Sequence, residues 1–201
     1  MLKIGLTGNI GCGKSSVSRE LSKYGIQIID ADIISREIYE YEDMLEIMEK
    51  NFPEALVSGR VDRKKLGQIV FSDKERLKVL NGITHRKIKE VVTERLALCS
   101  KNGQIAVVDA ALLYEAAFDD IVDKVAVVFC KEEEQLKRVI LRDSISEEEA
   151  LKRINSQMSQ EEKKNRADFV IDNSGSPEEL EEEIKRFMKQ IEMWKEEYGG
   201  M

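Results

Sequence analysis

The chain has 201 residues, which at roughly 150 residues per domain fits one domain with an insertion better than two full domains. Hydrophobic residues make up 42% and charged residues 35% of the chain, a composition that excludes a disordered or low-complexity protein. The 39 acidic residues outnumber the 32 lysines and arginines, and the net charge of −7 disfavours a nucleic-acid binder that works by bulk electrostatics.

We expect no membrane-spanning helix from the sequence. Its longest apolar run, Val125 to Cys130, is far shorter than the roughly 20 residues of a membrane helix, and the first residues lack the pattern of a secretory signal. The three cysteines, Cys12, Cys99 and Cys130, are not spaced like metal ligands. We therefore expect free thiols in a reducing cytosol and a cytoplasmic protein.

Five short runs of β-branched and apolar residues predict strands. They cover residues 3–7, 26–29, 105–108, 125–130 and 169–171. Because these runs lack polar alternation, we expect strands that are buried on both faces, as in a parallel sheet. Helical patterns lie between them, which is typical of βαβ units. The prediction is an α/β fold with a five-stranded parallel sheet flanked by helices.

A phosphate-binding motif follows the first strand. Residues 8–15 read Gly-Asn-Ile-Gly-Cys-Gly-Lys-Ser and match the P-loop pattern in full, in the required context of a strand before and a helix after. Backbone N–H groups of such a loop surround phosphate, Lys14 is predicted to neutralise the β- and γ-phosphates, and Ser15 is a magnesium ligand candidate. A mere glycine-rich turn would not explain Lys14 and Ser15 together. The predicted nucleotide contacts are Gly8, Gly11, Cys12, Gly13, Lys14, Ser15 and Ser16.

Two acids close the second strand, in the sequence Asp30-Ala31-Asp32. Ligands of open parallel sheets bind beyond the carboxyl ends of the strands. Asp32 is therefore predicted to be a base or an orienting group for an attacking hydroxyl, with a helix cap as the alternative. Arg36 would share a helical face with Asp32, where it could pair with this acid or hold an anionic group.

The segment from about residue 43 to residue 100 departs from the strict alternation of strand and helix. It reads as several helices with turns at 51–53 and 58–59, and we interpret it as an insertion that could hold a substrate. Asn81 and His85 are four residues apart and share a helical face. The spacing alone is weak evidence for a functional role of His85, the only histidine.

Carboxylates also follow the third strand. Asp109 directly ends it and is predicted to hold a magnesium-bound water, with a helix cap as the alternative. Glu115 comes after Leu112-Leu113-Tyr114 and could meet a polar group of a substrate. Taken alone, Glu115 would be assigned to the surface.

Charged helices lie between the fourth and fifth strands. Ser146 and Ser159 each precede a glutamate by three residues, which predicts two capped short helices broken near residues 157–158, as in a hinged flap. Arg138 and Arg142 are four residues apart at the start of this flap. Facing inward they could stabilise charge on a transferring phosphoryl group, and the alternative for two such arginines is a solvated face.

The last predicted helix is capped by Ser176 and carries one apolar stripe. The stripe consists of Leu180, Ile184, Phe187, Ile191 and Trp194. Its spacing indicates a face that docks against the body of the protein, because a coiled-coil dimer needs more heptads. We therefore expect a monomer.

In their order along the chain, these motifs resemble those of the dephospho-coenzyme A kinase family. The resemblance spans about residues 3 to 175. It rests on residues 4–15, 29–32 with Arg36, 62–63 with Leu66 and 70–71, Asn81 with His85, 112–115, Gln135 with Arg138 and Arg142, Gln157, 167–168 and 171–173.

This resemblance implies an ATP-dependent kinase with magnesium that phosphorylates the ribose 3′-hydroxyl of dephospho-coenzyme A, the last step of coenzyme A synthesis. It implies a core at about 1–40, 101–135 and 166–201, a helical acceptor-binding insertion at about 41–100 and a lid at about 136–165. The substrates would be small molecules, with no nucleic-acid or membrane partner.

The resemblance also implies roles for single residues. Asp32 would be the base, Arg142 a lid arginine near the phosphates, and Asn173 would lie near the adenine. Asn81 and His85 would lie in the acceptor domain.

Three positions depart from the usual family pattern: Asn9, Arg86 and Ala111. None of them removes a proposed chemical group.

A shikimate-type or nucleoside monophosphate kinase shares the loop and a carboxylate after the second strand. A GTPase switch is disfavoured, because Asn173 is followed by Ser-Gly-Ser rather than by the Lys-x-Asp that reads guanine.

Overall fold

The computed structural model describes residues 1–100 and 105–199, which fall into two compact units. The sheet unit consists of Met1–Asp30 and the chain from Arg95 onward, and the helical unit consists of Ala31–Glu94. The elements of the sheet unit are β1 (Lys3–Thr7), α1 (Lys14–Lys23), β2 (Gln27–Asp30), β5 (Ala106–Asp109), the 3₁₀ helix η3 (Phe118–Ile121), β6 (Lys124–Phe129), α6 (Glu132–Asp143), α7 (Glu147–Asn155), α8 (Gln160–Arg166), β7 (Phe169–Asp172) and α9 (Pro177–Gly199).

The predicted five-stranded parallel sheet is confirmed. Its strand order is β2-β5-β1-β6-β7, and all neighbouring strands run parallel. Each strand lies within one residue of its predicted bounds. The central strand β1 pairs on both sides, with Leu6 opposite Asp109 of β5 and Ala126 of β6. This register brings the carboxyl ends of three strands together beside the phosphate loop.

Alternation along the strands divides their side chains between the two faces of the sheet. Ile4 and Leu6 of β1 belong to one hydrophobic cluster with residues of α1 and α9. The intervening residue, Gly5, faces Leu113 instead, and a Cβ at this position would lie 2.5 Å from the Leu113 Cδ1 atom. Helices α1 and α9 therefore cover one face, and the segment after β5 covers the other near β1.

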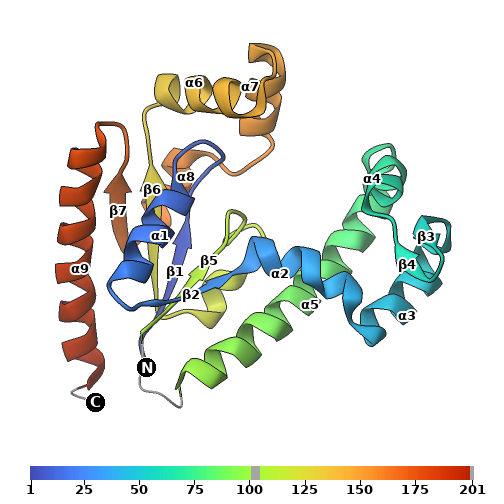
Figure 1. Ribbon diagram of the computed structural model, residues 1–201, viewed down its shortest axis with the longest axis horizontal. Coiled ribbons are helices and arrows are strands. Elements are labelled where there is room, and N and C mark those ends of the chain that lie inside the picture. Colours follow the sequence, from blue (N-terminus) through green and yellow to red (C-terminus); the bar gives the residue numbers. More distant parts are fainter. Residues whose placement is uncertain (101–104, 200–201) are drawn as a thin grey trace. The chain divides into compact units, whose positions relative to one another are not determined.

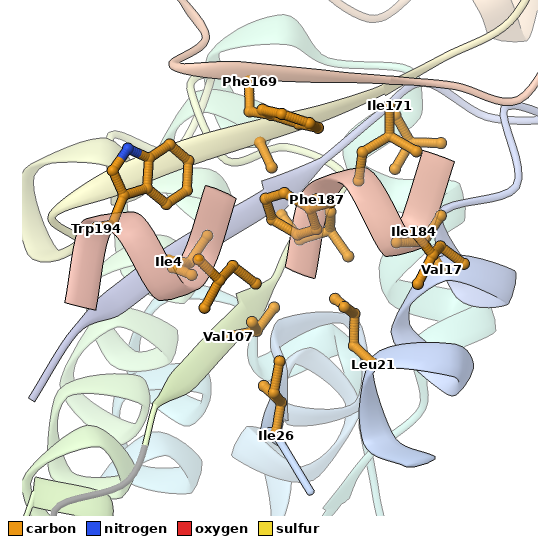
Figure 2. Packing of buried hydrophobic residues seen from close by; sticks show 14 of the residues in the cluster. Ile4, Val17, Leu21, Ile26, Val107, Phe169, Ile171, Ile184, Phe187 and Trp194 are labelled. Carbon is orange, nitrogen blue, oxygen red and sulfur yellow. The ribbon is translucent and has the colours of Figure 1, made fainter. Parts of the chain in front are cut away.

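The apolar stripe of α9 docks against the sheet, as its spacing predicts. Ile184, Phe187, Ile191 and Trp194 are buried in the cluster, and Figure 2 shows Phe187 and Trp194 beside Phe169 of β7. The ring centroids of Phe169 and Phe187 are 5.0 Å apart. These contacts fix α9 alongside β7 (Figure 1).

The helical unit begins directly after β2. Its elements are α2 (Ala31–Glu37), η1 (Ile38–Glu40), α3 (Glu42–Asn51), η2 (Pro53–Ala55), β3 (Leu56–Val57), β4 (Arg60–Val61), α4 (Arg63–Phe71) and the greater part of α5 (Lys74–Ser100), which continues into the sheet unit. Its core includes the buried side chains of Met44, Met48, Phe52, Leu66 and Val70. Figure 1 shows α3, β3, β4 and α4 grouped at the right of the view.

The interpretation of residues 43–100 as helices alone was incomplete, because β3 and β4 form a small antiparallel hairpin. The predicted turn at 58–59 is its tip, where Ser58 has φ 51° and Gly59 has φ 76°. Each strand has only two residues, too few for an alternating pattern to stand out.

The predicted flap helices are confirmed. Ser146 forms a reciprocal capping box with Glu149 at the start of α7, and the Ser159 hydroxyl accepts the Glu162 N–H at the start of α8. Helix α7 ends at Asn155, so the chain between the two helices is broken where the sequence indicates. Along the described ranges, no helix is long and apolar enough to cross a membrane.

Candidate active site

The phosphate loop connects β1 to α1, and its glycines are required by its geometry. Gly11 and Gly13 have φ angles of 83° and 86°, which non-glycine residues adopt only with strain. A Cβ on Gly8 would lie 2.6 Å from the Val128 carbonyl oxygen, and one on Gly13 would lie 2.1 Å from the Asn173 Nδ2 atom. The loop therefore packs too closely against its surroundings to carry side chains at these positions.

Lys14, the first residue of α1, pairs with the carboxylate of Asp109 at the end of β5. The Ser18 hydroxyl donates a second hydrogen bond to the same carboxylate. Burial raises the pKa of Asp109, and the Lys14 ammonium and the Ser18 hydroxyl act in the opposite direction. The structure thus brings the predicted phosphate-binding lysine and the predicted metal-site carboxylate into direct contact.

A cavity of about 840 Å³ opens beside the loop. Gly13 and Ser16 line it at the start of α1, and Arg138 and Asn173 line it from α6 and from the end of β7. Arg138 donates from NH1 to the Asn173 carbonyl oxygen at 2.9 Å. The Asn173 amide in turn donates to the Cys12 carbonyl oxygen at 2.7 Å. Five predicted site residues, Cys12 among them, are thereby brought together.

Arg142 stands apart from this group. Its guanidinium makes a two-bond contact with Asp143, with Nε–Oδ1 and NH2–Oδ2 distances of 2.7 and 3.0 Å. This contact raises the pKa of Arg142. Asp143 also accepts from Arg153 of α7 at 2.8 Å, so the exposed Arg142 lies at the corner between α6 and α7.

Asp32 and Arg36 lie in α2, directly after the carboxyl end of β2. Both side chains are exposed, and their spacing of four residues puts them on one face of the helix. Asp32 is in the first turn of the helix, where a negative charge is favoured by the helix dipole.

Asn81 and His85 lie in α5, also within the helical unit. Asn81 is exposed and His85 is half-buried. Burial lowers the pKa of His85, so the imidazole is neutral at physiological pH. A neutral imidazole has one donor and one acceptor nitrogen to offer to a polar substrate.

A family model described as dephospho-CoA kinase matches residues 2–179. The chain belongs to the dephospho-CoA kinase family. A dephospho-CoA kinase of Carboxydothermus hydrogenoformans is 43% identical over 199 residues, with 96% of this chain and 95% of the relative covered. The enzyme of Saccharomyces cerevisiae is 39% identical over 201 residues, with 96% of this chain and 83% of the relative covered.

Solved structures agree with this assignment. Dephospho-CoA kinase from Campylobacter jejuni superposes with a TM-score of 0.72 at 32% identity, with 94% of this chain and 96% of that chain covered. The Thermus thermophilus protein TT1252 superposes with a TM-score of 0.81 at 36% identity, with 94% and 97% covered. Shikimate kinase from Aquifex aeolicus, at 17% identity and a TM-score of 0.54, shares the fold.

The Glu115 carboxylate is bound by two groups of the same chain. One of its carboxylate oxygens, Oε1, accepts the Met158 N–H at 3.0 Å and lies 3.1 Å from the Lys163 Nζ atom. The Lys163 side chain, with an exposed fraction of 0%, also donates to the Ala111 carbonyl oxygen at 2.9 Å. Glu115 therefore joins the segment after β5 to the break between α7 and α8.

Two of the kinase's thiols meet beneath the phosphate loop. The Sγ atoms of Cys12 and Cys130 are 3.5 Å apart, and both residues are buried. This contact, together with burial, raises the pKa of Cys12. The Cys12 thiol donates to the Gln160 Oε1 atom at 3.0 Å, so it fills the loop as a protonated, hydrogen-bonded side chain.

The residues present fit a magnesium ion that arrives with a nucleotide. Within residues 1–100 and 105–199, no three His, Cys, Asp or Glu side chains gather as a metal cluster. Mg²⁺ at a nucleotide does not need one, because waters and phosphate oxygens complete its octahedron. Ser15 is exposed in the first turn of α1, and Asp109 supplies a carboxylate at the neighbouring strand end. Both offer the oxygen ligands that Mg²⁺ prefers.

Lys163 and Gln160 are two residues around the loop that the sequence did not single out. They lie in the charged helix α8, whose composition is that of an exposed helix. Gln135 and Gln157 belong to the family resemblance, but no pattern in the sequence gave them a role. Uncharged amides within a charged stretch are the signal that could have found the three glutamines.

Proposed function

We propose that this chain transfers the γ-phosphate of ATP to the ribose 3′-hydroxyl of dephospho-CoA. The observation that carries the proposal is the family match over residues 2–179, which spans both the phosphate loop and the helical unit. The relatives named dephospho-CoA kinase are matched over nearly their whole length in bacteria. The same match argues against a shikimate-type or nucleoside monophosphate kinase and against a GTPase.

In this proposal the phosphate loop holds the triphosphate. Its backbone N–H groups and the N-terminus of α1 surround the phosphates, and Lys14 exchanges the Asp109 carboxylate for phosphate oxygens. The nucleoside end occupies the 840 Å³ cavity that Arg138 and Asn173 line, a size within the usual range of roughly 300–1,000 Å³ for small-molecule sites.

Ser15 and Asp109 would hold Mg²⁺, Ser15 directly and Asp109 through a water. When bound, the ion neutralises charge that develops between the β- and γ-phosphates. Asp109 is well suited to this position because the Ser18 hydroxyl still donates to its carboxylate when Lys14 turns to the phosphates. Ser15 is available because its side chain is exposed.

The acceptor would be held by the helical unit. Asp32 takes the proton of the attacking hydroxyl or orients it, and Arg36 holds an anionic group of the acceptor. Asn81 and His85 offer neutral hydrogen-bonding groups from α5. Glu115 offers its second carboxylate oxygen, the one not engaged by Met158.

Arg142 would contribute from a lid at about residues 136–165. Its exposed guanidinium is paired with Asp143, and in the closed state it would exchange this carboxylate for phosphate oxygens. A closed lid also keeps water from the γ-phosphate. The core at about 1–40, 101–135 and 166–201 and the insertion at about 41–100 would complete a monomeric, cytoplasmic enzyme.

A substrate panel tests this function. The purified protein is given ATP and magnesium with dephospho-CoA, shikimate or a nucleoside monophosphate, and each product is identified by mass spectrometry. We expect phosphorylation of dephospho-CoA alone, with ATP preferred over GTP. Equal or faster phosphorylation of another acceptor would contradict the proposal.

A further inference from the structure

One residue of the phosphate loop, Ile10, has both of its backbone polar groups held by glutamines outside the loop. The Ile10 N–H donates to the Gln157 Oε1 atom at 2.8 Å. The Ile10 carbonyl oxygen accepts from the Gln135 Nε2 atom at 2.9 Å. Gln135 comes from α6 and is buried, and Gln157 lies in the break between α7 and α8.

Neighbouring loop positions are held by the same elements. The Asn9 Nδ2 atom donates to the Met158 carbonyl oxygen at 2.8 Å. Gln160 donates to the Gln135 Oε1 atom at 2.9 Å and accepts from the Cys12 thiol at 3.0 Å. The loop is thus in hydrogen-bonded contact with the flap at positions 9, 10 and 12.

The break between α7 and α8 is itself anchored. The Met158 N–H donates to Glu115, and Glu115 pairs with the fully buried Lys163. The Thr7 hydroxyl and Lys163 both donate to the Ala111 carbonyl oxygen, at 3.2 and 2.9 Å. Gln157 therefore reaches the loop from a support fixed to the end of β1 and to the segment after β5.

We propose that Gln135 and Gln157 are positioning residues for ATP, which set the conformation of the phosphate loop by fixing the backbone of Ile10 at its N–H and its carbonyl oxygen. The loop carries Gly8, Gly11 and Gly13, and glycines give a loop large conformational entropy in the absence of constraints. A ligand that binds a pre-ordered loop loses less of this entropy, so its affinity rises. The inference rests on the proposed use of ATP.

The two glutamines have opposite hydrogen-bonding roles, which makes a matched test possible. Gln157 must accept at Ile10, and a glutamate can still accept. Gln135 must donate to the Ile10 carbonyl oxygen. An ionised glutamate has no donor, so at position 135 it would place a carboxylate oxygen against this carbonyl oxygen. The same substitution, with the same added charge, should therefore be tolerated at 157 and harmful at 135.

The experiment measures the Kd of ATP by calorimetry for the full chain and its variants. Gln135→Glu should raise this Kd about tenfold or more, since the Ile10 carbonyl oxygen loses its donor and faces a carboxylate oxygen instead. Gln157→Glu should raise it less than threefold, and Gln157→Leu, which removes the acceptor, should raise it about tenfold. Gln27→Glu adds the same charge at the first residue of β2, on the opposite edge of the sheet, and should leave the Kd unchanged.

Steady-state kinetics separate positioning from a merely structural role. We expect the KM for ATP to follow the Kd in each variant, while kcat at saturating ATP changes less than threefold. Equal effects of the two glutamate substitutions, or a lowered Tm with an unchanged KM, would overturn the inference. If Gln135→Glu does not fold, the inference is tested by the Kd values of Gln157→Leu and Gln157→Glu, and equal values would overturn it. Failure of the wild-type protein to bind ATP would overturn the proposed function as well, and is seen separately in the same titration.

Discussion

Lys14 and Asp109 form the central charge pair of the phosphate site. Their side chains have exposed fractions of 13% and 4%, so both charges are largely removed from water. Removing one partner of a buried pair leaves the other charge desolvated and unpaired, which destabilises a protein more than the pair itself stabilises it. The pair therefore links the stability of the sheet unit to the residue that we propose contacts ATP.

Lys14→Ala should impair both stability and turnover. We expect a loss on the order of 3 kcal/mol in the free energy of unfolding, because Asp109 stays buried without its cation. Turnover should fall at least about 100-fold, the scale for loss of a group that stabilises transition-state charge. The double variant Lys14→Ala/Asp109→Asn should regain stability but not turnover, as measured by denaturant unfolding and by the substrate assay. A double variant no more stable than Lys14→Ala would show that the pair does not control stability.

The lowered pKa of the half-buried His85 side chain predicts that the stability of the protein depends on pH. Because burial lowers its pKa below 6.5 in the folded state, the unfolded chain binds the proton first as the pH falls. The stabilisation by neutral His85 is complete above about pH 6.5 and is lost on acidification. His85→Asn should therefore lose less of its free energy of unfolding between pH 7.5 and pH 5.5 than the wild type. Parallel stability curves for the two proteins would refute this role.

At the scale of elements, the sequence predicts the sheet well, because each strand is a run of apolar residues with a polar or glycine end. The P-loop motif likewise predicts a strand, a loop and a helix. The hairpin of β3 and β4 could not be predicted in this way, because strands of two residues are too short to show an alternating hydrophobic pattern. The glutamine contacts to Ile10 could not be predicted either, since they join residues separated by 125 and 147 positions, and no local pattern encodes such a pairing.

Gly13 in the phosphate loop and Gly25 between α1 and β2 offer a matched pair of glycine substitutions. Gly13→Ala and Gly25→Ala both put alanine at a positive φ, 86° and 78°, at a cost of roughly 1–2 kcal/mol. A Cβ at Gly13 meets the Asn173 amide at 2.1 Å, whereas one at Gly25 meets nothing within 4 Å. Gly13→Ala should therefore lower the Tm more and should weaken ATP binding, while Gly25→Ala should keep the wild-type Kd. Equal Kd values for both variants would contradict the close packing of the loop.

At the scale of the whole molecule, the predicted site residues separate by unit. The phosphate loop, Asp109, Arg138 and Asn173 belong to the sheet unit, and Asp32, Arg36, Asn81 and His85 belong to the helical unit. From the sequence, only Asn81 and His85 are assigned to the insertion at about 41–100, whereas Asp32 and Arg36 fall within the predicted core at about 1–40. Our account assigns ATP to the sheet unit and the acceptor contacts of Asp32, Arg36, Asn81 and His85 to the helical unit, with Glu115 as the one proposed acceptor contact from the sheet unit.

The decisive comparison is between the wild type and Asp32→Asn, with both the Kd of ATP and the rate of phosphate transfer to dephospho-CoA measured. Asparagine keeps the size of the side chain but removes its ability to take a proton. We expect an unchanged Kd, since our proposal places ATP in the sheet unit and Asp32 in the helical unit, and a transfer rate lower by about 10²–10⁴-fold. Near-normal transfer by Asp32→Asn, or no transfer to dephospho-CoA by the wild type, would contradict the account.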